Sequence, residues 1–290
     1  MRIAVTGTAG QVAQALARRG ALAGIDITPV GRPQLDLMSP ASIRTALESA
    51  RPDVIVSAAA YTAVDQAEID AETAFAVNDA GAGHVAAAAR ALGVPVLHLS
   101  TDYVFDGTGE RPYREDDAPS PKTVYGASKL AGEAKVLEAG GSVFRTAWVY
   151  SPAGANFVKT MVRLAGQQAE VRVVADQIGS PTSADDIADA LLRVAERQHE
   201  RPDDAALCGL FHLAGSETAA WSELAQGVFD LLASHGRPQC QAVPIATSAY
   251  PTRAKRPANS RLDGAKLKAT YGIELPGWRA SLPGVVAQLV

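Results

Sequence analysis

The first half of the chain alternates short runs of β-branched residues with longer stretches rich in alanine and leucine. This alternation predicts strands at 2–6, 27–30, 54–59, 95–100 and 142–150, and helices at 11–20, 40–50, 70–92 and 125–139. Because the strands show no clear polar alternation, helices must cover both faces of their sheet. Right-handed crossovers then predict an α/β fold with a Rossmann-like, doubly wound parallel sheet.

The second half is less regular and predicts a smaller attachment to this sheet. Its pattern predicts helices and strands in turn at 156–168 (helix), 170–177 (strand), 183–198 (helix), 209–215 (strand) and 221–235 (helix). We expect residues 1–150 and 184–217 to form an NAD(P)-binding Rossmann domain. Residues 151–183 and 218–290 would then form a C-terminal α/β substrate lobe.

Composition excludes several classes of protein. The chain has 290 residues, 47% of them hydrophobic, which is enough for a sizeable core. A net charge of −4 argues against a nucleic-acid partner, and no apolar run reaches the roughly 18 residues of a membrane span. Cys208 and Cys240 form no CxxC pattern, so neither a zinc site nor a disulfide framework is expected. The simplest location is the cytoplasm.

A glycine-containing loop joins the first predicted strand to the first predicted helix. In "VTGTAGQVAQAL" (5–16), Gly7 and Gly10 lie at the junction and Ala13 occupies the third small position. Glycines there let the backbone approach a pyrophosphate, whose charge meets the positive end of the helix. The spacing is GxxGxxA rather than GxGxxG, and a plain strand-to-helix turn is the alternative. Its place at the first βα junction favours dinucleotide binding.

The end of the second predicted strand indicates which dinucleotide is preferred. An acidic residue there would bind the ribose 2′-hydroxyl of NAD, whereas an arginine would receive the 2′-phosphate of NADP. The stretch "TPVGRPQLDL" has Arg32 and no acid before Asp36. NADPH is therefore favoured over NADH, although Arg32 as a solvated loop residue is the alternative.

Tyr125 and Lys129, in "TVYGASKLAGE", are the candidate reaction centre. Their i, i+4 spacing places both on one helix face, where the ammonium could lower the tyrosine pKa from about 10 and make Tyr125 a proton donor to a carbonyl. An exposed surface pair is the alternative. Ser100 and Thr101 end the fourth predicted strand, so a Thr101 hydroxyl could reach the same carbonyl.

Together these motifs resemble the extended short-chain dehydrogenase/reductase family. More narrowly, the chain resembles the dTDP-4-dehydrorhamnose reductases through eight blocks in the same order, from residue 1 to about 270. These blocks are "TGTAGQVAQAL", "VIVSAAAYTAVDQAE", "STDYVFDG", "VYGASKLAGE", "FRTAWVYSPAGANFVKTM", "DQIGSPTSADDIAD", "GLFHLAGS" and "RPANSRLD".

The resemblance implies that NAD(P)H reduces the 4-keto group of dTDP-4-dehydro-6-deoxy-L-mannose to dTDP-L-rhamnose, the last step of dTDP-rhamnose biosynthesis. Tyr125 would donate the proton, Lys129 would bind the nicotinamide ribose and tune Tyr125, and Thr101 would polarise the ketone. The other cofactor contacts would come from Gly7, Gly10, Gln11, Val12, Arg32, Asp36, Leu37, Ala58, Ala59, Ala60 and Tyr61.

Substrate contacts are expected from three regions. The first is the block Thr101, Asp102, Tyr103 and Val104, next to Tyr125. The second is the basic segment 253–268, where we select Arg256, although a solvated basic edge explains most of its cations. The third comprises Trp148, for which core packing is the alternative, and Asn156, with Phe157 and Lys159 as further candidates.

The resemblance also raises the questions of whether the protein binds a metal ion and whether it forms a dimer. Some family members bind Mg²⁺ at a dimer interface through a glutamate of the first helix, where this chain has Ala15. Asp185 and Asp186 remain, but a hard cation needs more oxygen ligands, and the histidines lack ligand spacing. We therefore expect no metal site and leave monomer and homodimer open.

Two other functions remain open from the sequence. One is a related epimerase or dehydratase that retains tightly bound NAD. The other is a non-catalytic protein like the regulatory subunit of methionine adenosyltransferase, which the intact Thr101, Tyr125 and Lys129 disfavour. The nucleotide base and the sugar stereochemistry are also left open.

Overall fold

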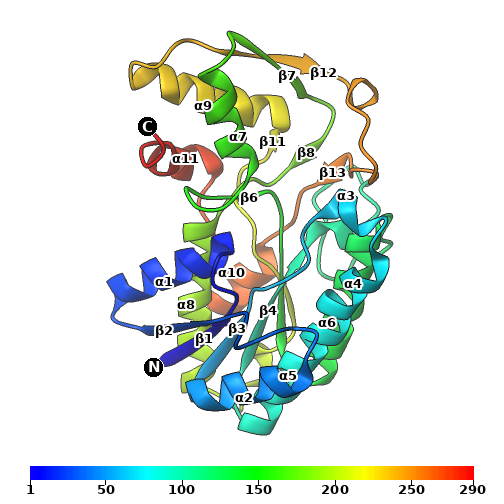
Figure 1. Ribbon diagram of the computed structural model, residues 1–290, viewed down its shortest axis with the longest axis vertical. Coiled ribbons are helices and arrows are strands. Elements are labelled where there is room, and N and C mark those ends of the chain that lie inside the picture. Colours follow the sequence, from blue (N-terminus) through cyan, green and yellow to red (C-terminus); the bar gives the residue numbers. More distant parts are fainter.

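The computed structural model describes residues 1–290 and contains a six-stranded sheet with a smaller group of elements beyond its carboxyl edge (Figure 1). Its strands are β1 (Arg2–Thr6), β2 (Asp26–Val30), β3 (Val54–Ser57), β4 (Val96–Thr101), β5 (Ser142–Thr146) and β10 (Leu210–His212). All pairings are parallel, in the order β10-β5-β4-β3-β1-β2. The predicted doubly wound sheet is confirmed, and its direction of winding changes between β1 and β3.

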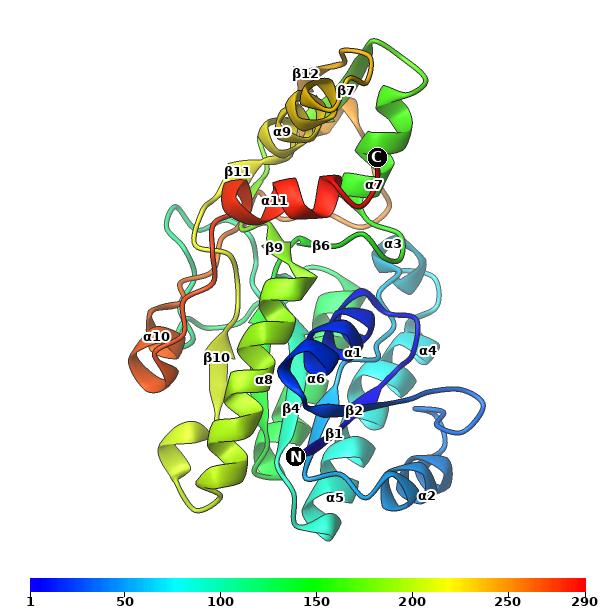
Figure 2. The same ribbon diagram turned by 90° about the vertical axis from the view of Figure 1, so that its left-hand side faces the viewer.

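Helices cover both faces of this sheet, because alternate strand residues point to opposite sides. Ile3 and Val5 pack in one core with α1 (Gln11–Ala23) and α8 (Ala184–Glu200), which lie side by side in Figure 2. Ala4 packs in another core with α2 (Pro40–Ala50), α5 (Ala82–Leu92) and α6 (Val124–Glu138). Both faces of the sheet are therefore buried, so a ligand site is expected at the carboxyl ends of the strands.

Two predicted elements are divided in the structure. The expected helix 70–92 consists of α4 (Ala71–Phe75), a π-helical segment (Ala76–Gly81) and α5. The expected strand 142–150 ends at Thr146, because Trp148 has a φ of 48° that no strand residue adopts. The chain continues as β6 (Val149–Tyr150), which pairs with β9 (Thr182–Ser183) in a separate sheet.

The smaller group of elements has its own hydrophobic core. This core joins α7 (Phe157–Ala165), α9 (Trp221–Ser234), α11 (Trp278–Val286), β7 (Glu170–Val174) and β12 (Gln241–Ile245). Between it and the main sheet lie β8 (Ile178–Gly179), β11 (Ala219–Ala220) and β13 (Asn259–Ser260). A separate core is what the proposed substrate lobe requires, and the division into two domains stays a proposal.

One helix assigned to the lobe lies elsewhere. Helix α10 (Ala265–Tyr271) places Leu267 and Tyr271, which share one helix face, in the same core as Phe211 of the main sheet. The Tyr271 hydroxyl also donates to the Leu207 carbonyl oxygen. The prediction that residues 218–290 all belong to the lobe is therefore wrong for α10, because its apolar face is buried against β10 and α8.

Candidate active site

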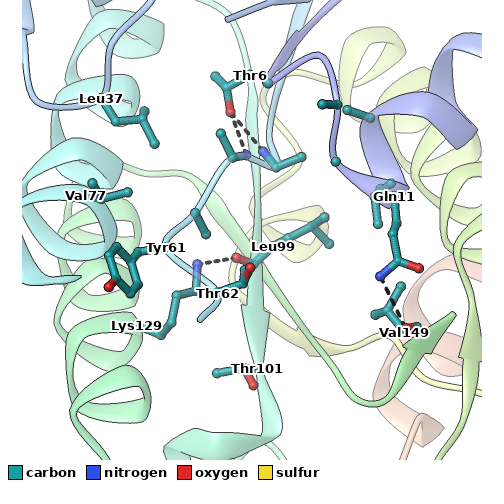
Figure 3. A pocket seen from close by; sticks show the side chains of 18 of the residues that line it. Thr6, Gln11, Leu37, Tyr61, Thr62, Val77, Leu99, Thr101, Lys129 and Val149 are labelled. Carbon is teal, nitrogen blue, oxygen red and sulfur yellow. Dashed lines mark hydrogen bonds between the residues drawn. The ribbon is translucent and has the colours of Figure 1, made fainter. Parts of the chain in front are cut away.

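The carboxyl ends of β1 to β5 open into one cavity of about 1030 Å³ (Figure 3). Residues that the sequence separates by more than 140 positions line it together. Of the predicted site residues, the following lie there: Gly7, Gly10, Gln11, Val12, Arg32, Asp36, Leu37, Ala58, Ala59, Ala60, Tyr61, Thr101, Asp102, Tyr103, Tyr125, Lys129 and Trp148. Val104, Asn156 and Arg256 do not line this cavity.

The glycine loop has a backbone that only glycine adopts easily. Gly7 has a φ of 93°, its N–H donates to the Val30 carbonyl oxygen at 2.7 Å, and a Cβ there would lie 3.3 Å from the Ala59 Cβ. Gly10 is the N-cap of α1 and supplies no capping side chain. The first-turn amides of α1 are therefore available to an anion, which fits the pyrophosphate of a dinucleotide.

Thr6, which the sequence analysis did not select, connects two of the loops that form the cavity. Its Oγ1 accepts hydrogen bonds from the backbone N–H groups of Ala58 and Ala59, both at 3.0 Å (Figure 3). This threonine ends β1, and β3 ends beside it in the sheet. Thr6 therefore holds the loop after β3 against the glycine loop. The sequence signal that could have identified it is a hydroxyl residue at the end of the first strand.

Asn78 is a second residue that the sequence analysis missed. It lies in the π-helical segment, where its Oδ1 accepts from the Tyr61 N–H at 2.8 Å. Its Nδ2 donates to the Tyr61 carbonyl oxygen and to Ser128 Oγ, both at 3.0 Å. The extra residue of a π turn is not visible in a sequence pattern. Asn78 thereby ties Tyr61 to the helix that carries Tyr125.

The far end of the cavity holds Arg32 and Asp36. Arg32 is exposed and forms no salt bridge, so its guanidinium is available to a phosphate. Asp36 Oδ1 accepts from the Met38 N–H at 2.9 Å, which turns this carboxylate toward its own loop. Both residues thus line the part of the cavity that follows β2.

Tyr125 and Thr101 lie close together at the inner end of the cavity. Helix α6 begins at Val124 because the Thr123 hydroxyl caps it, accepting from the Gly126 N–H at 3.0 Å. The Tyr125 ring packs edge-on against Tyr103, with centroids 5.5 Å apart. Burial raises the pKa of Tyr125 well above its usual value, and the Thr101 side chain opposes that rise. Tyr125 therefore holds its proton at neutral pH.

Lys129 is directed at β4. Its Nζ lies 2.7 Å from the Leu99 carbonyl oxygen, as Figure 3 shows, and 3.0 Å from His98 Nε2. Burial lowers the pKa of Lys129 to about 8. The expectation that Lys129 lowers the Tyr125 pKa toward neutrality is wrong for this structure, because burial dominates at the phenol and the ammonium is turned to the strand.

Asp102 is a buried carboxyl in the same part of the cavity. Its Oδ1 accepts from the Thr101 hydroxyl at 3.1 Å, and its Oδ2 has no hydrogen-bond partner. Burial raises its pKa to about 6. Asp102 lines the cavity as a buried carboxyl, so it is available to accept a hydrogen bond from a bound ligand.

The residues expected at the substrate end have unequal positions. Trp148 lines the main cavity and stacks on Trp221, with ring centroids 3.4 Å apart. Arg256 donates to the Tyr103 hydroxyl at 2.9 Å and pairs with Asp65. It lines a second cavity of about 330 Å³ that shares Tyr103 with the first.

Two expected substrate contacts are placed away from both cavities. Val104 is fully buried and packs with Phe105. Asn156 caps α7, where its Oδ1 accepts from the Lys159 N–H at 3.1 Å and its Nδ2 donates to Gln11 Oε1 at 3.0 Å. Both side chains therefore make contacts within the protein here, Asn156 by holding Gln11, and their direct contact with substrate stays a prediction.

No group of three or more histidine, cysteine, aspartate or glutamate side chains is arranged to hold a metal ion. Asp185, one of the two acids considered, pairs with Arg18, and Asp186 accepts from the Ser281 hydroxyl at 2.5 Å. The absence of a metal site stays a prediction.

A glycine loop on a doubly wound sheet, with a threonine, a tyrosine and a lysine at the inner end of its cavity, defines a dinucleotide-binding oxidoreductase. The whole chain, residues 1–290, matches the model of the RmlD substrate binding domain. The chain therefore belongs to this family.

Named relatives agree over the full length. The chain is 48% identical to a dTDP-4-dehydrorhamnose reductase of Sinorhizobium fredii, with 100% of this chain and 98% of the relative covered. It is 40% identical to the enzyme of that name from Escherichia coli, with the same coverage. A solved dTDP-4-dehydrorhamnose reductase of Bacillus anthracis, in complex with NADP, aligns with a TM-score of 0.90 at 33% identity over 99% of both chains.

Proposed function

We propose that this protein is an NAD(P)H-dependent oxidoreductase that reduces the 4-keto group of dTDP-4-dehydro-6-deoxy-L-mannose, giving dTDP-L-rhamnose. The observation that carries the proposal is the meeting of Thr101, Tyr125 and Lys129 at the inner end of a cavity that begins at a dinucleotide-type glycine loop. Membership of the RmlD family over residues 1–290 supports the substrate, since relatives 48% and 40% identical carry the name of this reductase.

The residues divide the chemistry in a simple way. A bound nicotinamide supplies the hydride that reaches the carbonyl carbon. Tyr125, which holds its proton at neutral pH, gives that proton to the carbonyl oxygen, so the ketone becomes a secondary alcohol. On binding of the ketone, the Thr101 hydroxyl would turn from Asp102 Oδ1, to which it donates here, and donate its one hydrogen bond to the same oxygen. Two N–H groups of the Lys129 ammonium are used by His98 and Leu99 of β4. The third would donate to the ribose beside the nicotinamide.

The remainder of the substrate is a nucleoside diphosphate, which needs cations and a flat surface. Trp148 at the main cavity supports sugar or base contact. Lys122, Lys255 and Arg256 line the second cavity and support placement of the diphosphate there. These contacts, like the site residues above, are proposals that substrate-bound crystals would test.

The test of this function is direct. Purified protein with dTDP-4-keto-6-deoxy-L-mannose should consume NADPH or NADH, followed as loss of absorbance at 340 nm, and should form one equivalent of dTDP-L-rhamnose. Runs with and without a chelator test metal dependence, and we expect no difference. Absence of oxidation with either cofactor would contradict the proposed function, and tightly bound NAD in the purified protein would favour an epimerase or dehydratase.

We further propose NADPH as the preferred cofactor, because Arg32 is exposed and has no acidic partner. Replacing Arg32 by alanine should raise the KM for NADPH by roughly tenfold, through loss of a charge-assisted contact to the 2′-phosphate, and leave the KM for NADH nearly unchanged. Arg90→Ala, which removes an exposed arginine outside the cavity, is the matched control. Equal effects on both cofactors would contradict this assignment.

None of the helices combines the length and the hydropathy needed to cross a membrane. A cytoplasmic location, and a monomeric or homodimeric state, complete the proposal. The first is tested by cell fractionation and the second by light scattering of the purified protein.

A further inference from the structure

Three buried polar side chains form a hydrogen-bonded chain on the face of the sheet that α6 covers, next to the reaction centre. Ser57 of β3, His98 of β4 and Lys129 of α6 are each 2% exposed or less. His98 Nδ1 lies 3.0 Å from Ser57 Oγ, and His98 Nε2 lies 3.0 Å from Lys129 Nζ. Ser57 and His98 are also direct partners in the register of the two strands. The imidazole is therefore held on both of its nitrogens.

The chemistry of these groups settles the direction of both hydrogen bonds. An ammonium has three N–H donors and no acceptor, so His98 Nε2 must accept from Lys129. The imidazole proton then resides on Nδ1 and is donated to Ser57 Oγ. Burial lowers the pKa of His98 well below its usual value, and the charge of Lys129 adds to this effect. His98 thus stays a neutral acceptor at working pH.

The strand offers no packing reason for a histidine at this position. In β4, Val96 packs in the hydrophobic core on the α6 side of the sheet, while Leu97 and Leu99 pack in the core on the other side. His98 follows the alternation of Val96 and so lies on the α6 side, where an aliphatic side chain would fill the space without needing hydrogen-bond partners.

The three N–H donors of the Lys129 ammonium suggest a role for His98. One N–H is given to the Leu99 carbonyl oxygen and a second to His98. Both partners belong to β4, so together they fix the direction of the ammonium and leave one N–H toward the cavity that Lys129 lines. With Leu99 alone, the ammonium could rotate about a single hydrogen bond.

We propose that His98 is a positioning residue, which anchors the Lys129 ammonium through Nε2 so that its third N–H points at the cofactor ribose, and that Ser57 sets the imidazole tautomer that makes this possible. This inference rests on the proposed reductase function, because it assigns Lys129 to a bound nicotinamide ribose. It adds a residue of β4 to a site that the family motif describes only through Thr101, Tyr125 and Lys129.

The acidic groups near Lys129 interact mainly with other residues. Glu133, one turn along α6, raises the pKa of Lys129 and forms a buried ion pair with Arg145 of β5. Asp79 of the π-helical segment pairs with Lys135. Asp102, after β4, acts on Tyr125. His98 differs from these charged groups because it contacts Nζ directly, so its removal takes away a hydrogen bond that none of them makes.

Three substitutions test the role by geometry. His98→Gln keeps an acceptor near the position of Nε2, whereas His98→Asn is too short to reach Lys129 but can still meet Ser57. His98→Leu removes both contacts at similar volume. The control is His212→Leu, a fully buried histidine of the same sheet whose ring nitrogens have no partners and which lies outside the cavity. Thermal unfolding checks that each variant is folded.

Two measurements are made on every protein. One is the pH profile of hydride transfer from NADPH, by stopped-flow absorbance at 340 nm. The other is the dissociation constant for NADPH, by nucleotide fluorescence, at each pH. Lys129 must be charged, so activity and affinity fall as pH rises through its pKa. Loss of an acceptor disfavours the charged form, and the alkaline limb should move to lower pH.

We expect this limb to move by about one pH unit in the asparagine and leucine variants, with NADPH bound about tenfold more weakly, and to stay near the wild-type position in the glutamine variant and the control. Equal behaviour of the glutamine and asparagine variants would overturn the proposal, and this pair decides it if the leucine variant does not fold. A wild-type protein that binds NADPH but reduces no ketone would refute the proposed function, and the affinity profiles would still test the role of His98.

Discussion

Replacing Tyr125 by phenylalanine is expected to lower kcat for ketone reduction by at least about a hundredfold, with little change in NADPH affinity. The phenol is the proton donor in the proposed reaction, and burial keeps its pKa high enough that it is protonated throughout the neutral range. Hydride transfer without a proton donor would leave an alkoxide in a partly buried cavity. The ring itself, which packs on Tyr103, is retained in the variant.

The control for this prediction is Tyr150→Phe. Tyr150 is also a buried tyrosine whose pKa burial raises, but it lies outside the cavity, in the core of the smaller group of elements. We expect wild-type turnover from it. Steady-state rates at 340 nm and NADPH titrations of both variants provide the check. Turnover of Tyr125→Phe within a few fold of the wild type would refute the role of Tyr125 as proton donor.

The second large effect is expected at Glu133, which stabilises the fold under the site. Glu133 and Arg145 are 2% and 3% exposed, and they share two hydrogen bonds of 2.9 and 2.6 Å. The Ser100 hydroxyl donates to the same carboxylate. The ion pair therefore connects α6, which carries Tyr125 and Lys129, to β4 and β5.

Glu133→Leu should lower the free energy of unfolding by roughly 3–5 kcal/mol, because it leaves the Arg145 guanidinium buried without its counter-charge. The double variant Glu133→Leu/Arg145→Met removes both charges and should regain much of that loss. Urea unfolding followed by circular dichroism measures both. A single variant that is less than about 1 kcal/mol destabilised, or a double variant that is no more stable than the single one, would contradict this account.

Much of the fold was predictable because its signals are local. The Rossmann-like sheet followed from short apolar runs separated by amphipathic helices, and the glycine loop from residues adjacent in the chain. Trp148 shows where such signals end. Its left-handed backbone divides the strand expected at 142–150 into β5 and β6, which pair in different sheets. The residue type does not predict this break in the strand, since tryptophan rarely adopts a left-handed backbone.

The candidate site divides in the same way. The sequence by itself determined which residues are available for proton transfer and for a close backbone approach to a ligand, because these properties depend on residue type and spacing. Tyr125 and Lys129 share one helix, four residues apart, and Gly7 permits the turn. Only the tertiary structure decided what surrounds them. Burial raises the pKa of Tyr125, and His98, 31 residues away in the chain, holds Lys129. These contacts and this burial arise from packing between segments that are distant in the chain, and local sequence patterns do not predict such packing.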